Sequence, residues 1–275
     1  MTLRLCLIGQ GVAASPSPAM HNAALQALHI DGTYEVCDLD RQALREFASR
    51  MRGGAYQGCN VTIPHKAAMA ALCDELEDDA AVLGITNTVV ADQGGLRGAN
   101  TDVAGFATAL RQADLWPEPG GDAVVFGAGG AAAAVALALA RVPVGRITVV
   151  ARTPGTAAAM LARAAPGVSC AEAGWTRAEA AGALHTADIV VNATPVGLDG
   201  LPLDLTRLRR SCTVADVRYR PRPVDVVAAA AAAGLRSCDG AGMLLCQGML
   251  SLRRWTDMEP PWDVARVALL EALDS

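Results

Sequence analysis

Lysine is almost absent from this chain of 275 residues, because Lys66 is the only lysine among 23 basic side chains. The chain has no excess of positive charge, since its 28 acidic and 23 basic side chains give a formal net charge of −5. A net negative charge disfavours nucleic acid and anionic membrane surfaces as main partners. The composition therefore points to a small-molecule partner, with no nucleic acid and no membrane.

The eight cysteines contain no C-x-x-C pair. Several of them, such as Cys6 and Cys59, lie inside apolar runs. Paired spacing is typical of zinc sites and redox motifs, and disulfide frameworks are typical of small secreted proteins. We therefore expect buried, reduced thiols in a cytoplasmic protein and no metal site.

The chain has no convincing membrane segment or signal peptide. The apolar run at the N-terminus is too short for a signal peptide. Residues Ala123–Ala140 form an uncharged stretch of 18 residues, but three glycines interrupt it and most of the rest is alanine. Alanine is weakly apolar, and a β-type run broken by glycines makes a poor membrane helix. We expect a buried segment instead.

Lys66 has two interpretations. Either a single lysine remains by chance in an arginine-rich composition, or Lys66 has a role that arginine cannot fill. A lysine ammonium changes its protonation state when it is desolvated, whereas a guanidinium stays charged. The composition alone leaves both interpretations open.

A glycine turn between residues 122 and 134 predicts a dinucleotide site. A short β-type run ends at Phe126, and Gly127-x-Gly129-x-x-Ala132 then leads into an alanine-rich helix. The first glycine permits a tight turn, the second leaves room for a pyrophosphate, and the alanine allows close helix packing. The helix N-terminus then offers unpaired N–H groups to the phosphates. The alternative is an ordinary βα turn.

The end of the next strand bears on the choice of cofactor. An NAD site usually carries an acidic residue there, about 20 residues after the glycines. This chain has Ala151-Arg152-Thr153, with no carboxylate. An arginine complements the 2′-phosphate of NADP, so the sequence favours NADP over NAD. The alternative for Arg152 is a solvated charge at a strand end.

The remaining chain alternates strand-like and helix-like segments, which predicts an α/β protein. Expected strands are 3–8, 33–39, 57–62, 86–91, 96–99, 123–126, 145–150, 187–191, 213–217 and 235–238. Expected helices are 19–29, 40–51, 64–73, 75–83, 103–113, 224–234, 243–255 and 263–273, together with the alanine-rich helix.

Ser17 precedes Pro18 and fits a helix N-cap with proline in the first turn. Its hydroxyl, together with free N–H groups at the helix start, also suits a carboxylate ligand. The alternative is capping alone, and the sequence leaves both open.

Polar residues also follow an expected strand at 57–62. Asn60, Thr62 and Lys66 lie at its C-terminal end, where open α/β sheets bind ligands. We expect His65 to be a surface residue at a helix start, the alternative being a second titratable group. Asp102 precedes the expected helix at 103–113, and one interpretation is that it only caps this helix.

Taken together, the motifs resemble the shikimate dehydrogenases and their quinate/shikimate dehydrogenase relatives, essentially from end to end. The matching segments are Ser15-Pro-Ser17-Pro-Ala-Met-His21-Asn22, Asn60-Val-Thr62-Ile-Pro-His-Lys66, Asn87-Thr88, Gly98-Ala-Asn100-Thr101-Asp102, the glycine turn, Ala151-Arg152-Thr153, Asn192-Ala-Thr-Pro-Val-Gly197, Asp216-Val-Arg-Tyr219-Arg-Pro221 and Gly242-Met-Leu-Leu-Cys-Gln247.

The resemblance implies a two-domain α/β protein with a reaction cleft between the domains. Residues 1–102 plus 239–275 would form a substrate-binding and catalytic domain, and residues 103–238 a Rossmann-type dinucleotide-binding domain. The implied reaction is the NADP-dependent interconversion of shikimate and 3-dehydroshikimate, a step of the chorismate pathway in aromatic amino acid biosynthesis. The implied assembly is a monomer or a homodimer.

The resemblance also assigns roles to individual residues. The implied catalytic acid–base pair is Lys66 and Asp102. The implied substrate contacts are Ser15, Ser17, Thr62, Asn87, Tyr219 and Gln247. The implied cofactor contacts are Gly127, Ala128, Gly129, Gly130, Ala131, Arg152, Thr153, Thr194 and Gly240, and no metal is implied.

Some positions depart from the family pattern. Ala14 replaces a common histidine, Ala151 replaces an asparagine, Thr156 lies near the place of a second arginine, and Thr86 replaces a valine. These changes suggest weaker 2′-phosphate binding and leave NAD use open. Alternatives are therefore a quinate or aminoshikimate dehydrogenase that uses NAD or NADP, and a non-catalytic, metabolite-sensing relative.

Overall fold

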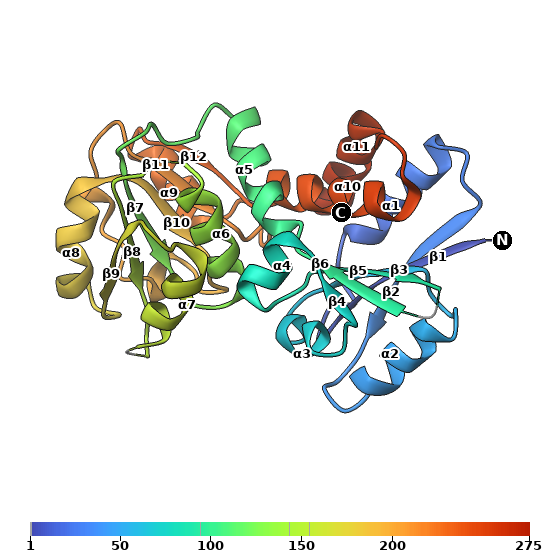
Figure 1. Cartoon of the computed structure of the whole chain (residues 1–275). Helices are drawn as coiled ribbons and strands as arrows, with labels where there is room; N and C mark the ends of the chain where they lie inside the picture. Colours follow the sequence, from blue (N-terminus) through green and yellow to red (C-terminus); the bar gives the residue numbers. More distant parts are fainter. Residues whose placement is uncertain (1, 94, 143, 154) are drawn as a thin grey trace. The chain divides into compact units, whose positions relative to one another are not determined.

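The structure is a computed structural model that describes residues 2–93, 95–142, 144–153 and 155–275. The chain forms two compact units (Figure 1). Unit 1 comprises Met1–Gly105 and Leu244–Ser275, and unit 2 comprises Phe106–Met243. Two helices, α5 (Asp102–Gln112) and α10 (Ala241–Thr256), begin in one unit and end in the other. Each unit holds its own sheet, which confirms the predicted two-domain α/β architecture.

The sheet of unit 1 is mixed, with the order β2-β1-β3-β5-β6-β4. Strands β1 and β2 are parallel, β3 and β5 are antiparallel, and β5 and β6 form a hairpin. The bounds are β1 Leu3–Gly9, β2 Gly32–Asp38, β3 Gly58–Val61, β4 Glu75–Leu76, β5 Thr88–Asp92 and β6 Gly95–Ala99.

Helices pack on this sheet through regularly spaced apolar residues. In α2, Leu44, Phe47, Ala48 and Met51 recur at helical spacing and are all buried against the sheet. Helix α11 packs against α1, so the C-terminal residues complete the unit that the N-terminal residues begin (Figure 1). The bounds are α1 Ser17–Ala27, α2 Leu44–Arg52, α3 Lys66–Ala70, α4 Asp78–Leu83 and α11 Trp262–Asp274.

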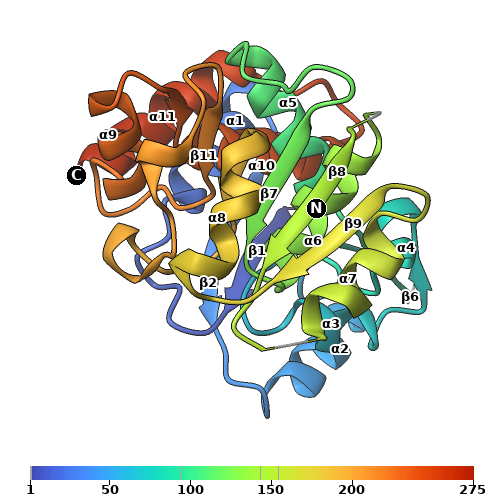
Figure 2. The same cartoon turned by 90° about the vertical axis from the view of Figure 1, so that its left-hand side faces the viewer.

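Unit 2 has a parallel sheet in the order β12-β11-β10-β7-β8-β9. The neighbouring strands β7, β8 and β9 are labelled in Figure 2. The strands β7, β8 and β10 are almost continuously apolar and buried, as expected of parallel strands covered on both faces. The bounds are β7 Asp122–Phe126, β8 Arg146–Val150, β9 Ser169–Ala173, β10 Ala187–Asn192, β11 Thr213–Asp216 and β12 Arg236–Cys238.

The uncharged stretch at 123–140 folds as strand β7, the glycine turn and helix α6 (Gly130–Ala140). Residues Ala132–Leu139 of that helix are all buried, so its apolar character serves packing inside the unit. No helix among the described residues combines the length and the hydropathy that a membrane crossing requires. The other helices of unit 2 are α7 Thr156–Ala164, α8 Arg177–Thr186 and α9 Asp225–Ala232.

The structure differs from the expected elements most clearly over 75–83 and over 151–186. We expected a helix over 75–83, but Glu75 and Leu76 pair with β6 and the helix begins at Asp78. The Asp74 carboxylate accepts a hydrogen bond from Leu96 N and fixes this segment to the sheet edge. The sequence also predicted no element between 151 and 186, where α7, β9 and α8 lie.

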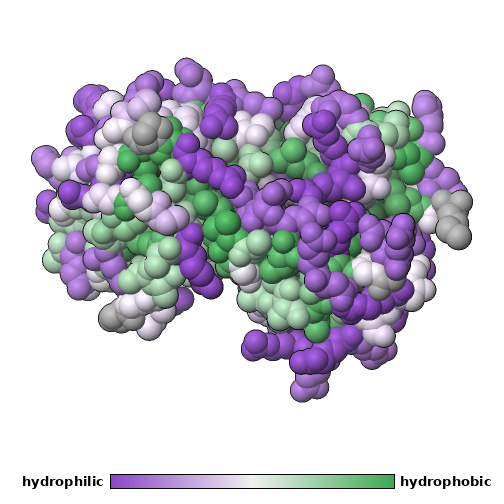
Figure 3. All heavy atoms as spheres, in the orientation of Figure 1, coloured by the Kyte–Doolittle hydropathy of each residue, from purple (hydrophilic) through white to green (hydrophobic). Residues whose placement is uncertain are grey.

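Hydrophilic and hydrophobic residues are both present on the surface of each unit. Figure 3 shows hydrophilic residues over much of the visible face, with hydrophobic residues among them. Three exposed apolar side chains, Val264, Val267 and Leu270, belong to α11. Exposed apolar side chains are common on protein surfaces and do not by themselves indicate a partner.

Candidate active site

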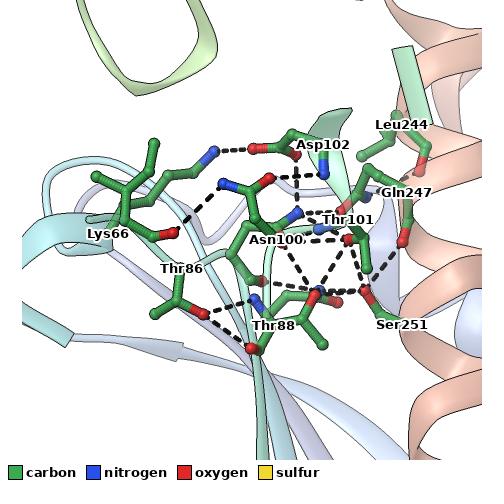
Figure 4. A network of polar contacts seen from close by, with 12 residues as sticks. Lys66, Thr86, Thr88, Asn100, Thr101, Asp102, Leu244, Gln247 and Ser251 are labelled. Carbon is green, nitrogen blue, oxygen red and sulfur yellow. Dashed lines mark hydrogen bonds and ion pairs between the residues drawn. The ribbon is translucent and has the colours of Figure 1, made fainter. Parts of the chain in front are cut away.

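Lys66 and Asp102 form a close ion pair in unit 1. The Lys66 Nζ lies 2.5 Å from the Asp102 Oδ2, and the two side chains are only 16% and 8% exposed. Lys66 is the first residue of α3 and Asp102 the first residue of α5 (Figure 4). The sequence thus places both groups where a strand has just ended. Because the pair is largely shielded from water, the carboxylate fixes the direction of the ammonium group.

The structure contradicts the alternative that Asp102 serves only as an N-cap. The Asp102 N–H donates to the side-chain oxygen of Asn100, so Asn100 provides the capping acceptor. The Asp102 carboxylate instead accepts from Lys66 through Oδ2 and from Asn87 Nδ2 through Oδ1, at 2.8 Å. Both carboxylate oxygens are therefore committed to the candidate site.

Asn87 connects the ion pair with helix α10. Its Nδ2 lies 2.9 Å from Thr101 Oγ1, 2.8 Å from Asp102 Oδ1 and 3.1 Å from Gln247 Oε1. An amide NH2 has two hydrogens, so three acceptors compete for them. The longest contact is to Gln247. The Gln247 Nε2 also donates to the Leu244 carbonyl at 2.9 Å.

A buried cluster of hydroxyl groups, from Thr88, Thr101 and Ser251, lies next to Gln247 (Figure 4). Ser251 Oγ lies 2.7 Å from Thr88 Oγ1 and 3.1 Å from Thr101 Oγ1. It also accepts from Asn60 Nδ2 at 2.9 Å and donates to the Gln247 carbonyl. This network ties β3, β5 and α10 together around the candidate site.

The sequence missed most of this hydroxyl network. Thr88 and Thr101 belong to quoted motifs, but neither was assigned a role, and Ser251 was not singled out. Its position four residues after Gln247, on the same side of a helix, was the available signal.

Ser15 and Ser17 also lie in unit 1, close to each other. The Ser15 hydroxyl is 3.1 Å from the Ser17 hydroxyl and accepts from Ser17 N–H at 3.2 Å. Among the described residues, no hydrogen bond joins these serines to Lys66 or Asp102. Asp38 fixes the preceding loop, since its carboxylate accepts from Gly11 and Val12 N–H.

The N-cap prediction for Ser17 is wrong by one residue. Helix α1 begins at Ser17 itself, Pro16 occupies the N-cap position, and no side chain caps the helix. The helix starts earlier because the chain already turns at Pro16, whose carbonyl accepts from Ala19 N–H at 3.1 Å, while Ser15 Oγ accepts from Ser17 N–H. The hydroxyl of Ser17 is thus not used for capping.

The structure also corrects the prediction for His65, which is fully buried and not a surface residue. Its Nε2 lies 2.8 Å from the carbonyl oxygen of Leu39. A carbonyl only accepts, so Nε2 carries the hydrogen. His65 packs against the segment after β2 and anchors the start of α3. Thr62 precedes it, and Thr62 N–H donates to Ile8 O in the neighbouring strand.

The cysteine prediction needs one correction. All eight cysteines are free, but only Cys6, Cys59, Cys212 and Cys246 are buried. Cys37, Cys73 and Cys238 are half-buried, and Cys170 is exposed. Cys170 lies on β9, the edge strand of its sheet, where only one side is covered. Among the described residues, no group of three or more metal-binding side chains could hold an ion.

The glycine turn of unit 2 has the geometry that a dinucleotide requires. Gly127 has φ +106°, a conformation that L side chains rarely adopt, and Ala132 is fully buried against its surroundings. A Cβ added at Gly129 would meet no atom within 4 Å, so the space above this glycine is open. No side chain caps helix α6, whose N-terminal N–H groups remain available at Gly130 and Ala131.

The other predicted cofactor residues also lie in unit 2. Ala128 is part of the glycine turn, and Thr194 abuts it, since a Cβ added at Gly127 would lie 2.7 Å from Thr194 Cγ2. Arg152 is exposed directly after β8, and Thr153 follows it. A Cβ at Gly240 would lie 2.0 Å from the Val217 carbonyl, so packing alone already requires a glycine there.

A network of charged side chains follows β10 and β11 in the same unit. Arg218 Nη2 donates to the buried Asp216 carboxylate at 2.7 Å, and Asn192 Nδ2 donates to the same oxygen at 2.9 Å. The hydrogen bonds that Arg218 donates to the Asp216 carboxylate hold the pKa of Arg218 above its usual range. Thr194 donates to Asn192 Oδ1, so this network orients the threonine. Tyr219 follows Arg218, and burial raises the pKa of its phenol.

Family models match two stretches of the chain, which lie mostly in unit 1. Residues 7–89 match the shikimate dehydrogenase substrate binding domain. Residues 240–270 match the shikimate 5′-dehydrogenase C-terminal domain.

Whole-chain comparisons agree with these matches. The NADP(+)-dependent shikimate dehydrogenase of Rubrobacter xylanophilus is 40% identical over 96% of this chain and 94% of its own length. The shikimate 5-dehydrogenase of Thermus thermophilus, solved with NADP(H) and shikimate, is 35% identical with a TM-score of 0.88, covering 99% of this chain and all of that one. The quinate dehydrogenase of Corynebacterium glutamicum, solved with NAD, is 32% identical with a TM-score of 0.88 over 98% of this chain and 99% of that one.

Proposed function

The chain belongs to the shikimate dehydrogenase family, and we propose that it reversibly reduces 3-dehydroshikimate to shikimate with NADPH. This reaction is a step of aromatic amino acid biosynthesis. The observation that carries the proposal is the shielded Lys66–Asp102 ion pair, which Asn87 links to Gln247. The proposed reaction needs this pair, because one group must donate and accept the proton while the other holds it in position.

The pair suits the proton transfer that ketone reduction requires. NADPH, when bound, supplies the hydride to the carbonyl carbon. Negative charge then develops on the carbonyl oxygen, and Lys66 donates a proton from Nζ to form the hydroxyl group. Asp102 accepts a hydrogen bond from the ammonium and holds it in position during this step. In the reverse direction, neutral Lys66 accepts the proton from the alcohol.

The surrounding polar groups suit a small hydroxylated carboxylate. The adjacent hydroxyls of Ser15 and Ser17 offer donors for a carboxylate group. Thr62, Asn87 and Gln247 offer a hydroxyl and two amides for ring hydroxyls. We assign these residues, and Tyr219 of unit 2, to substrate binding.

We assign the cofactor to the glycine turn and the residues after β8. The open space at Gly129, the uncapped start of α6 and the exposed Arg152 support this assignment. The names of the Rubrobacter and Thermus relatives support NADP.

Quinate dehydrogenase activity with NAD is the second candidate. It is favoured by the similarity to the Corynebacterium enzyme, whereas Arg152 favours NADP. Aminoshikimate is a third possible substrate of the same chemistry. A purely metabolite-sensing role conflicts with the intact Lys66–Asp102 pair.

A spectrophotometric panel tests the proposal. The purified chain is assayed at 340 nm with NADP+ or NAD+ against shikimate, quinate and aminoshikimate. We expect shikimate with NADP+ to give the highest kcat/KM. If quinate with NAD+ is best, the second candidate is correct. Binding of cofactor with no turnover of any substrate would favour the sensing role.

We also propose a cytoplasmic location and a monomeric or homodimeric state. The eight free cysteines support a reducing compartment. Size-exclusion chromatography with light scattering measures the assembly, and a larger oligomer would contradict this part of the proposal.

A further inference from the structure

An acidic side chain occupies the loop that follows β8. Glu172 lies on β9, beside Val149 of β8. Its Oε1 accepts a hydrogen bond from Gly155 N–H at 2.9 Å, and its Oε2 accepts from Ala158 N–H at 3.3 Å. Gly155 is the N-cap residue of helix α7, and Ala158 lies in its first turn. The carboxylate therefore lies at the N-terminus of α7.

The same loop begins with Arg152 and Thr153, which we assign to the 2′-phosphate of NADP. Such a phosphate is an anion, and it gains from an arginine and from the free N–H groups at a helix N-terminus. Here two of the N–H groups are already satisfied by Glu172. No side chain from within α7 caps that helix, so Glu172 takes the role of its capping anion.

The charges of Arg152 and Glu172 therefore have opposite effects on the binding of a 2′-phosphate. Arg152 is exposed and attracts a phosphate, whereas Glu172 places a fixed negative charge beside the same segment. A 2′-hydroxyl carries no charge and is not repelled by a carboxylate. Glu172 therefore affects the phosphorylated cofactor more than the unphosphorylated one.

We propose that Glu172 is a specificity-determining residue that lowers the preference for NADP over NAD by opposing the 2′-phosphate. This inference rests on the proposed function only for the position of the cofactor, and not for the identity of the substrate. It predicts that the chain uses NAD more readily than Arg152 alone would indicate.

Glu172→Gln tests the proposal, because glutamine removes the charge and keeps one acceptor oxygen for Gly155 N–H. The variant also loses the longer hydrogen bond from Ala158 N–H. Isothermal titration calorimetry measures the affinity of the whole chain for 2′,5′-ADP and for 5′-AMP, which differ in the 2′-phosphate. We expect 2′,5′-ADP to bind about fivefold more tightly to the variant, as expected for one nearby surface charge. The affinity for 5′-AMP should change less than about twofold, and the gain should shrink at high salt.

Glu179→Gln is the matched control. Glu179 is also exposed and lies in the first turn of a helix in unit 2, where Thr176 and not loop 152–158 is its partner. The control removes the same charge and should leave both affinities unchanged.

The proposal is overturned if Glu172→Gln changes both ligands equally, changes neither, or is matched by the control. A melting temperature close to that of the parent chain verifies that α7 is still formed. Since these ligands bind without any substrate, the result is independent of the panel that tests the proposed reaction.

Discussion

In unit 1 the side chains around Lys66 are held by other side chains, whereas the glycine turn of unit 2 is shaped by its backbone. Asn87, Asp102 and Ser251 each contact several polar side chains, and all are buried. At Gly127 and Gly129 the relevant features are a backbone angle and an open space.

This difference follows from the chemistry that each region is proposed to perform. A proton donor must hold one nitrogen in one direction, which requires directional partners. A pyrophosphate is bound by several N–H groups of the main chain, which requires the absence of side chains. Activity should therefore be most sensitive to the removal of side-chain atoms around Lys66 in unit 1. Cofactor binding should be most sensitive to the addition of side-chain atoms at the glycine turn of unit 2.

Removal of the Lys66 amine should have the largest effect. Lys66→Ala leaves the developing oxyanion without its proton donor, and we expect kcat to fall by about two to four decades. The substrate Kd should change much less, because Ser15 and Ser17 remain. Steady-state kinetics and substrate titration measure the two quantities, and near-normal turnover would remove Lys66 from the mechanism.

Addition of one carbon at each glycine should separate folding from binding in unit 2. Gly127→Ala places a Cβ 2.7 Å from Thr194 Cγ2 at φ +106°, so we expect a loss of stability of about 1 to 3 kcal/mol. Gly129→Ala meets no atom within 4 Å, so its melting temperature should stay unchanged. Its NADP+ affinity should nevertheless fall about 30-fold, because the methyl group enters space assigned to the pyrophosphate.

Thermal unfolding and cofactor titration of both variants measure this separation. Parental NADP+ affinity in Gly129→Ala would show that the pyrophosphate does not approach this glycine. Parental stability in Gly127→Ala would show that the positive φ is not required.

The sequence predicted the parts of this comparison that depend on local patterns. The glycine turn was visible because strand, glycines and helix are contiguous. Lys66 was identified because it is the only lysine and follows an expected strand, and the family resemblance paired it with Asp102. Their direct contact was not visible in the sequence, since it depends on how β3, β5 and β6 pair.

Other features depended on contacts far apart in the sequence. Ser251 meets Asn60 and Thr88 only after α10 packs on the sheet. His65 was misplaced on the surface because its partner, the Leu39 carbonyl, lies in another segment. Glu172 was missed because β9 was not predicted, and an isolated acidic residue gives no signal.

His21 is the exception within unit 1 and gives the smallest expected effect. It is fully buried, stacks on Tyr34 at 4.1 Å, and has no hydrogen-bond partner on either ring nitrogen among the described residues. Burial lowers the pKa of His21 from 6.5 to about 3. The folded protein therefore keeps the ring neutral where the unfolded chain is protonated.

The unfolded chain binds the extra proton, so the contribution of His21 to stability is present above pH 6.5 and is lost as the pH falls toward 3. At pH 5.5 the loss should be about 1.4 kcal/mol, one pH unit below the unfolded pKa. His21→Phe keeps a stacked ring without a titrating group, so the difference in its unfolding free energy between pH 7.5 and 5.5 should be smaller by that amount. Urea denaturation at the two pH values measures it. An unchanged pH dependence in the variant would mean that His21 has the same protonation state in the folded and the unfolded chain. The absence of hydrogen bonds to this stacked ring would then make no pH-dependent contribution to the unfolding free energy.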